Sequence, residues 1–207
     1  MSLVAVISDI HACAEDLSAV LSEIDRHQAD HIWCLGDFAS GGPDPLACYE
    51  MVALRCDLIL GGNHELFVAA KAWENSQEDW AKWAEHAFNQ LGVERSEILM
   101  MLPTHLEGEN LQLVHGSLRD PLWEFISSEA TAKQQWPLMS SDFLFFGHTH
   151  KRAFWLQEGQ QKIETGQWTA LSPKAMLNPG PVAQKRQWLL LETDLEDLPM
   201  LAKWMEA

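Results

Sequence analysis

The first 60 residues contain three short apolar runs, Leu3–Ile7, Ile32–Leu35 and Leu58–Leu60. Each run ends at a polar or glycine-containing turn. Continuous apolar runs of this length are typical of strands that are covered on both faces. The segments between them predict helices: Leu17, Val20, Leu21 and Ile24 recur at helical spacing, and Pro45 can begin a helix that ends near Arg55. Repeated strand–loop–helix units favour an α/β sheet with right-handed crossovers.

Residues 65–102 show helical periodicity without a convincing strand. Their apolar stripe consists of Trp80, Trp83, Ala84, Ala87, Phe88 and Leu91. Ser76 can cap this helix and Gly92 can end it. Trp73, Trp80 and Trp83 are candidates for stacking on a nucleobase, but their helical spacing favours packing in a helix seam. We interpret 65–102 as a helical insertion beside the sheet or a cap above it.

Strand patterns return in the second half of the chain. They comprise Leu111–Val114, Phe143–Phe146, a hairpin of Ala153–Leu156 with Lys162–Thr165 joined across 158–160, and Trp188–Leu191. The acidic segment 192–206 is expected to be a solvated surface segment with Leu195, Leu198, Leu201 and Trp204 facing inward. Because no linker, repeat or low-complexity tract interrupts the chain, we expect a single domain over 1–207.

Composition narrows the class of protein. The 207 residues are 47% apolar and 21% charged, with a formal net charge of -16. This excludes a disordered chain and disfavours binding of long nucleic acids. No apolar run approaches the roughly 18 residues of a membrane span, and no secretory signal is evident, so a cytoplasmic protein without a membrane partner is expected. The four cysteines lack metal-type spacing, and we expect reduced thiols.

Metal-capable side chains cluster immediately after the predicted strands: Asp9, His11, Asp37, Asn63, His115, His148 and His150. Loops at the carboxyl ends of strands in an α/β sheet converge on one crevice. Seven donors are too many for one zinc ion and suit two divalent ions that share a carboxylate. Mixed nitrogen and oxygen donors without thiolate favour manganese, iron, zinc or nickel.

The order of these blocks resembles that of the calcineurin-like metallophosphoesterase superfamily. The blocks are Asp9-Ile10-His11, Gly36-Asp37, Gly62-Asn63-His64-Glu65, His115-Gly116 and Gly147-His148-Thr149-His150. Residues 42–45, 115–121 and 178–182 resemble the small prokaryotic branch of that superfamily. The resemblance implies a four-layer α/β/β/α sandwich with two mixed sheets packed face to face.

The resemblance also implies roles for individual residues. Asp9, His11 and His150 would hold the first metal; Asn63, His115 and His148 would hold the second; Asp37 would bridge them. His64 would touch the phosphate and assist the leaving group, with Glu65 orienting it in place of the aspartate found in many relatives. Manganese is the first expectation for both metal ions. Ala12 and Pro181 depart from a common glycine and a common serine, and neither departure removes a ligand.

The implied reaction is hydrolysis of a phosphodiester or nucleotide-type substrate by a metal-bound hydroxide. Arg119 and Arg186 are candidates for binding the phosphate of a small substrate. A protein serine/threonine phosphatase, a non-catalytic metal-binding scaffold of the same fold and a structural single-zinc protein remain alternatives. The oligomeric state is left open by the sequence.

Overall fold

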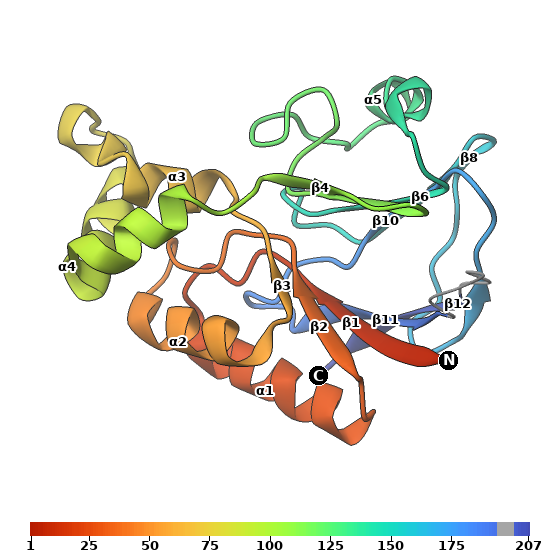
Figure 1. Ribbon diagram of the computed structural model, residues 1–207, viewed down its shortest axis with the longest axis horizontal. Coiled ribbons are helices and arrows are strands. Elements are labelled where there is room, and N and C mark those ends of the chain that lie inside the picture. Colours follow the sequence, from red (N-terminus) through yellow and green to blue (C-terminus); the bar gives the residue numbers. More distant parts are fainter. Residues whose placement is uncertain (194–200) are drawn as a thin grey trace.

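Two six-stranded sheets form the centre of the computed structural model, which describes residues 1–193 and 201–207 (Figure 1). The first sheet contains β1 (Ser2–Ile7), β2 (His31–Cys34), β3 (Leu58–Ile59), β9 (Thr169–Ala170), β11 (Gln187–Thr193) and β12 (Leu201–Glu206), in the order β3-β2-β1-β11-β12-β9. The second contains β4 (His105–Glu107), β5 (Leu111–Val114), β6 (Phe143–Phe146), β7 (Ala153–Leu156), β8 (Gly159–Gln160) and β10 (Ala175–Asn178), in the order β4-β5-β6-β10-β7-β8.

Both sheets mix parallel and antiparallel pairs. Strands β1, β2 and β3 are parallel, and the two crossovers between them contain α1 (Ala14–Arg26) and α2 (Pro45–Arg55), as the sequence pattern predicts. Strand β11 returns antiparallel on the other side of β1. In the second sheet, β5 and β10 are both parallel to β6, whereas β4 and β7 are antiparallel to their neighbours. The parallel strands therefore direct their carboxyl ends toward one edge.

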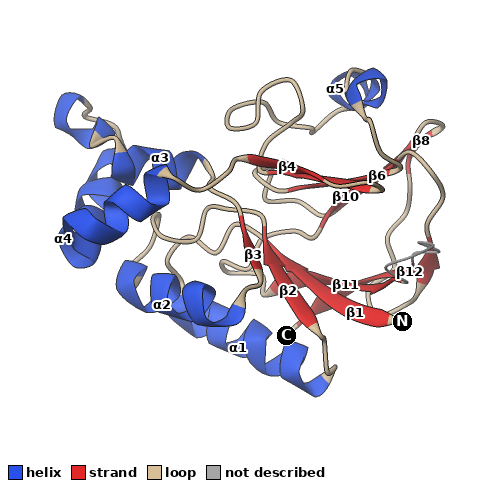
Figure 2. Cartoon of the chain, in the orientation of Figure 1, coloured by secondary structure: helices blue, strands red, loops and turns tan. Residues whose placement is uncertain are grey.

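The residues of β1 divide between two hydrophobic clusters. Val4 and Val6 belong to the cluster between the sheets, whereas Ala5 and Ile7 belong to the one shared with the helices. Strand residues alternate between faces, so a strand covered on both sides needs the continuous apolar run seen in the sequence. Figure 2 shows α1 and α2 outside one sheet and α5 (Glu129–Lys133) outside the other, which confirms the four-layer α/β/β/α sandwich. A short 3-10 helix, η2 (Trp136–Leu138), follows α5.

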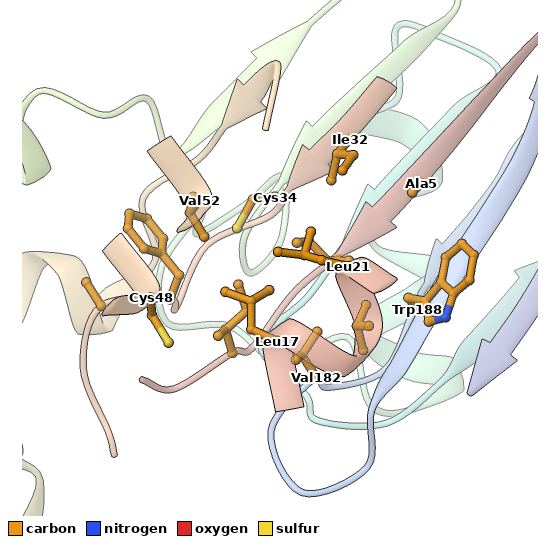
Figure 3. Packing of buried hydrophobic residues seen from close by; sticks show 14 of the residues in the cluster. Ala5, Leu17, Leu21, Ile32, Cys34, Cys48, Val52, Val182 and Trp188 are labelled. Atoms are coloured by element: carbon orange, nitrogen blue, oxygen red, sulfur yellow. The ribbon is translucent and has the colours of Figure 1, made fainter. Parts of the chain in front are cut away.

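The predicted stripe of α1 is buried along its length, from Leu17 to Ile24. In Figure 3, Leu17 and Leu21 lie in one cluster with Ile32 and Cys34 of β2 and with Val182. Burying a leucine of this size stabilises the fold by about 1.5–3 kcal/mol. The helix is thus fixed against the sheet whose strand ends carry the candidate ligands.

The helical block lies beside the sheets, near β3 and β4 (Figure 1). It consists of α3 (Asn63–Ala69), the 3-10 turn η1 (Ala72–Asn75) and α4 (Asp79–Met100). The predicted helix end at Gly92 is confirmed: Gly92 is not helical, with φ 75° and ψ 175°, and α4 consists of two helices that meet at this kink. Glycine tolerates this conformation because it lacks a Cβ, so the first helix ends there and a second one begins directly after it.

Two expectations for the last third of the chain are wrong. Strand β7 pairs with β8, placing Leu156 opposite Gly159, and Lys162–Thr165 forms no strand. Ile163 supplies the apolar signal there by packing against the inter-sheet cluster without strand pairing. The segment 201–206 is strand β12, not a solvated surface segment, but Trp204 faces inward as expected and is fully buried; Leu195 and Leu198 lie outside the described residues. Among described residues, no helix has the length and apolarity to cross a membrane.

Candidate functional site

All seven predicted ligands lie where strands end. Asp9 and His11 follow β1, Asp37 follows β2, and Asn63 begins α3 just after β3. His115 follows β5, while His148 and His150 follow β6. Because both sheets bring these ends to one edge of the sandwich, segments more than a hundred residues apart in sequence meet there.

One group of donor atoms contains Asp9, His11, Asp37 and His150, all within 4.8 Å of one another. The Nε2 atoms of His11 and His150 are 2.8 Å apart. Nε2 of His150 lies 3.7 Å from Oδ1 of Asp9, and Nε2 of His11 lies 4.0 Å from Oδ2 of Asp37. Two imidazoles and two carboxylates thus converge on one point.

A second group contains Asp37, His115 and His148. Nε2 of His115 is 3.3 Å from Oδ2 of Asp37 and 3.2 Å from Oδ1 of Asn63. Nδ1 of His148 is 3.2 Å from the same Nε2 atom. Asp37 therefore belongs to both groups, in the position that a bridging carboxylate would occupy.

The hydrogen bonding of His115 shows that this second group fits a cation. Its Nδ1 lies 2.9 Å from the carbonyl oxygen of Leu35. Because a carbonyl oxygen can only accept a hydrogen bond, Nδ1 must carry the hydrogen. In the neutral imidazole the other nitrogen, Nε2, then carries a lone pair, and this lone pair faces the oxygens of Asp37 and Asn63. Acceptors that converge in a buried place need a positive charge between them, either a proton or a metal ion.

The pKa values of the candidate ligands reflect their burial and their closeness to one another. Burial by itself would lower the pKa of His115, but the adjacent Asp37 carboxylate outweighs it and raises that pKa to about 9. Burial lowers the pKa of His11 to about 4, so its imidazole is neutral, as a ligand must be. Burial, supported by the charge of Asp37, raises the pKa of Asp9 to about 7. Two bound cations would replace these protons.

The backbone is strained where the candidate ligands stand. Five of the seven have positive φ: Asp9 (54°), His11 (46°), Asp37 (55°), His148 (63°) and His150 (53°). Residues with a Cβ seldom adopt this left-handed region, and strain of this kind clusters at functional sites. Ala12, at the position where the family resemblance predicts a glycine, has φ 51°, a conformation that glycine adopts more readily.

Glycine is required beside the shared carboxylate for a different reason. A Cβ atom at position 62 would lie 2.2 Å from Oδ1 of Asp37 and 2.8 Å from Cε1 of His115. Heavy atoms cannot approach so closely, so only glycine lets the chain before α3 pass this near to the ligands. Gly62 thus contributes to the site through the space that it leaves.

Glu65 holds the loop that carries Asp37. Its fully buried carboxylate accepts four backbone hydrogen bonds of 2.7–2.9 Å, from the N–H groups of Asp37, Phe38, Ala39 and Gly62. The expected contact in which Glu65 orients the His64 ring is not among them. The ring atom Nδ1 of His64 is buried and has no hydrogen-bond partner among the described residues, and the backbone N–H of His64 donates to Oδ1 of Asp37 at 2.9 Å. Glu65 therefore positions backbone, not the imidazole.

The two predicted phosphate-binding arginines are engaged elsewhere. Arg186 donates from Nε to Asp16 at 2.7 Å and from a terminal nitrogen to Glu15 at 3.0 Å. A terminal nitrogen of Arg119 lies 3.4 Å from Glu124. In the described part of the chain, neither arginine lines a hollow at the site. Carboxylates neutralise both: Arg186 pairs with Glu15 and Asp16, which are distant in sequence, and Arg119 pairs with Glu124, five residues further along the chain.

Two hollows open on the candidate ligands. One, of about 310 Å³, is lined by Asp37, Asn63, His64, Phe125, His148, Thr149 and His150. The other, of about 440 Å³, is lined by His11, Cys13, Gly41, His64, Trp80, Trp83, His150, Pro181, Ala183, Gln184 and Lys185. His64 and His150 face both. Sequence reasoning missed Lys185, whose only signal was its place beside Arg186, and Phe125, whose ring stacks on His148 with centroids 4.0 Å apart.

Known proteins resemble this chain in sequence and in fold. Residues 1–193 match the model of the calcineurin-like phosphoesterase superfamily domain. A metallophosphoesterase from Sphaerobacter thermophilus is 26% identical, with a TM-score of 0.85 over 100% of this chain and 88% of its own. An uncharacterized protein of Methanocaldococcus jannaschii is 28% identical over 89% of this chain and 78% of its own length. A symmetrical bis(5'-nucleosyl)-tetraphosphatase of Klebsiella pneumoniae is 27% identical over 66% of this chain, which spans half of that enzyme.

Proposed function

Because this chain belongs to the calcineurin-like phosphoesterase superfamily and is a phosphoester hydrolase of that metal-dependent family, we propose that it binds two divalent cations and hydrolyses a small phosphodiester or nucleotide-type substrate. Asp9, His11 and His150 would hold one ion, and Asn63, His115 and His148 the other. Asp37 would bridge them.

The position of Asp37 is the observation that carries this proposal. Its Oδ2 atom lies 4.0 Å from Nε2 of His11 and 3.3 Å from Nε2 of His115, which belong to different groups of donors. A pair of ions held about 3.5–4 Å apart supplies Lewis-acid polarisation of a phosphoryl group and lowers the pKa of a water molecule. The donors contain no thiolate, which favours manganese, iron, zinc or nickel.

His64 is the proposed general acid. It lines both hollows, so its ring borders any ester that spans them. The bond from its backbone to Asp37 fixes it relative to the shared ligand, and its ring centroid is 4.6 Å from that of His11. A proton passed from the imidazole to the departing oxygen would leave that oxygen neutral, an effect worth about 10²- to 10⁴-fold in rate.

The size of the two hollows supports a small substrate. Their volumes, about 310 and 440 Å³, suit ligands of nucleotide size better than a folded phosphoprotein. The name of the Klebsiella pneumoniae relative, a tetraphosphatase acting on nucleosides linked by phosphates, supports the nucleotide type. The helical block supplies Trp80 and Trp83 to one wall, so we interpret it as part of a single domain that flanks the site.

Metal content and turnover measured on one sample test the proposal. Purified protein loaded separately with Mn²⁺, Fe²⁺, Zn²⁺ or Ni²⁺ should hold two ions per chain by elemental analysis and hydrolyse bis(p-nitrophenyl) phosphate. Asp37→Asn should lose at least one ion and nearly all turnover, whereas Asp79→Asn, an exposed carboxylate of α4, should change neither. Two ions without turnover on any ester would favour the scaffold. One ion per chain would favour the single-zinc alternative.

A further inference from the structure

The larger hollow extends from the candidate metal centre toward the helical block. His64 and His150 line it together with the smaller hollow, so the two spaces meet at these imidazoles. A phosphorus atom beside Asp37 would therefore have one of its ester groups directed into the larger hollow. That hollow is the place where the organic part of a substrate is recognised.

The wall on the side of α4 is aromatic. Trp80 stacks on Phe67 with ring centroids 3.9 Å apart and an interplanar angle of 14°, and Phe67 in turn lies 5.7 Å from the His64 ring. Trp80 thus packs in the seam that its helical spacing predicts. Trp83, one turn later, does not: it is 41% exposed and lines the hollow. It offers an aromatic face to whatever enters.

The lining of the larger hollow also includes a cation. Lys185 lies in the loop between β10 and β11, and its Nζ atom is 3.3 Å from the carbonyl oxygen of His150. The loop is held at the site because Val182 donates to the carbonyl of Ser8 at 3.0 Å and Ala183 to that of Asp9 at 3.1 Å. Within residues 1–193 and 201–207, no carboxylate lies at ion-pair distance from Lys185, in contrast to its neighbour Arg186.

The charge of this hollow differs from that of the molecule. The chain has 30 acidic and 14 basic residues, yet the residues that line the hollow include one lysine and no aspartate or glutamate. A space without carboxylates in its lining, beside the candidate metal ligands of an otherwise acidic protein, can admit an anion. The apolar ring of Trp83 and the ammonium group of Lys185, which has no described carboxylate partner, together suit a ligand that is both planar and anionic.

We propose that the larger hollow is the nucleotide-recognition pocket of this phosphoesterase, in which Trp83 stacks on the base and Lys185 binds a phosphate outside the bond that is cleaved. The inference rests on the proposed function and adds to it the substrate class, a nucleoside phosphate. Both residues determine specificity and neither takes part in proton transfer. Stacking on an aromatic side chain is tolerant of base identity, so purine and pyrimidine nucleotides are both accepted.

Equilibrium binding tests the pocket separately from catalysis. The probes are α,β-methylene adenosine diphosphate, which resists cleavage between its phosphorus atoms, and methylenediphosphonate, which lacks the nucleoside. Calorimetric titration of the metal-loaded protein should give at least tenfold tighter binding of the nucleotide. Trp83→Ala should weaken nucleotide binding about tenfold and remove most of this preference, and Trp83→Phe should restore most of it. Lys185→Gln should weaken both probes by a similar factor.

Two matched controls accompany these variants. Trp168 is 42% exposed and contacts Lys203, outside both hollows, and Lys133 pairs with Glu129, so Trp168→Ala and Lys133→Gln should bind both probes as wild type does. The pocket assignment is overturned if methylenediphosphonate binds as tightly as the nucleotide, or if Trp83→Ala keeps the full preference. If either occurs while wild type still holds two ions and hydrolyses bis(p-nitrophenyl) phosphate, the proposed function stands and only the pocket fails.

Discussion

The backbone N–H of His64 donates to Oδ1 of Asp37 at 2.9 Å, and this bond joins the proposed general acid to the carboxylate shared by both groups of ligands. Oδ2 of the same carboxylate faces the imidazoles of His11 and His115. The Asp37 side chain therefore positions His64 through Oδ1 and faces both groups of donor atoms through Oδ2. Changes near Asp37 are therefore expected to affect metal binding and proton donation together.

Replacement of Gly62 should demonstrate how closely Asp37 is enclosed. In Gly62→Ala the new methyl group would fall 2.2 Å from Oδ1 of Asp37, which forces the carboxylate away from the imidazoles. We expect loss of at least one metal ion by elemental analysis and a fall in turnover of about 10²-fold or more. In Gly108→Ala the methyl group meets its nearest neighbour at 3.4 Å, so this control should behave as wild type. Full metal content in Gly62→Ala would show that the site tolerates this displacement.

The role of His64 can be separated from metal binding. His64→Ala removes the imidazole but keeps the backbone N–H that Asp37 accepts, so the fold and both ions should be retained. Turnover of an ester with a poor leaving group should fall by about 10²- to 10⁴-fold, and the loss should be smaller for p-nitrophenolate, which needs less protonation. Equal losses for good and poor leaving groups would contradict a role as general acid.

Glu65 should contribute to stability through its two acceptor oxygens. Glu65→Gln replaces an acceptor oxygen by an amide NH₂ group, which would face two of the four backbone N–H groups that the carboxylate now satisfies. Two buried donors would lose their partner, at a cost of about 2–4 kcal/mol in the free energy of unfolding measured with urea. Glu97→Gln, on the exposed surface of α4, should change stability by less than about 0.5 kcal/mol. A Glu65→Gln protein as stable as wild type would show that the loop does not depend on this carboxylate.

Without metal, the protein should lose stability at high pH because Asp9, one of the candidate metal ligands, is buried. Burial raises the pKa of Asp9 from 3.8 to about 7, so between these values the folded state holds a proton that the unfolded chain has lost. The stability linked to this group is therefore complete at low pH and is lost as the pH rises through 7. The isosteric variant Asp9→Asn has no charge to bury, so without metal it should exceed wild type by about 2–4 kcal/mol at pH 8.

Urea unfolding of chelator-treated protein at pH 8 and pH 5 measures this effect. The stability difference between Asp9→Asn and wild type should shrink at pH 5, whereas Asp79→Asn should track wild type at both pH values because that side chain is exposed. With metal present the order should reverse, since the ionised Asp9 then has a cation to bind. A wild-type protein that is the more stable one at both pH values without metal would contradict the assignment of Asp9 as a strained, buried carboxylate.

The local pattern of apolar residues predicted the strands and helices whose buried positions recur at regular spacing. The run Leu3–Ile7 indicated a strand covered on both faces, and β1 is one. Periodicity failed where an apolar residue packs without regular strand pairing: Ile163 suggested a strand and instead packs, half-buried, from a loop. For 201–206 the pattern correctly predicted that Trp204 faces inward, but the acidic composition of the tail concealed the strand β12 that buries it.

The sequence by itself determined which donors lie at strand ends, because strands and their terminating turns follow from local hydrophobic pattern and from the need of parallel strands to be covered. Only the tertiary structure decided what those donors and their neighbours face. Arg186 and Lys185 are adjacent in the chain, yet Arg186 is paired with Asp16, 170 positions away, while Lys185 turns to the hollow beside His150. Charges are neutralised by whatever the fold brings within a few ångströms, and the partners of a side chain are set by packing between distant segments.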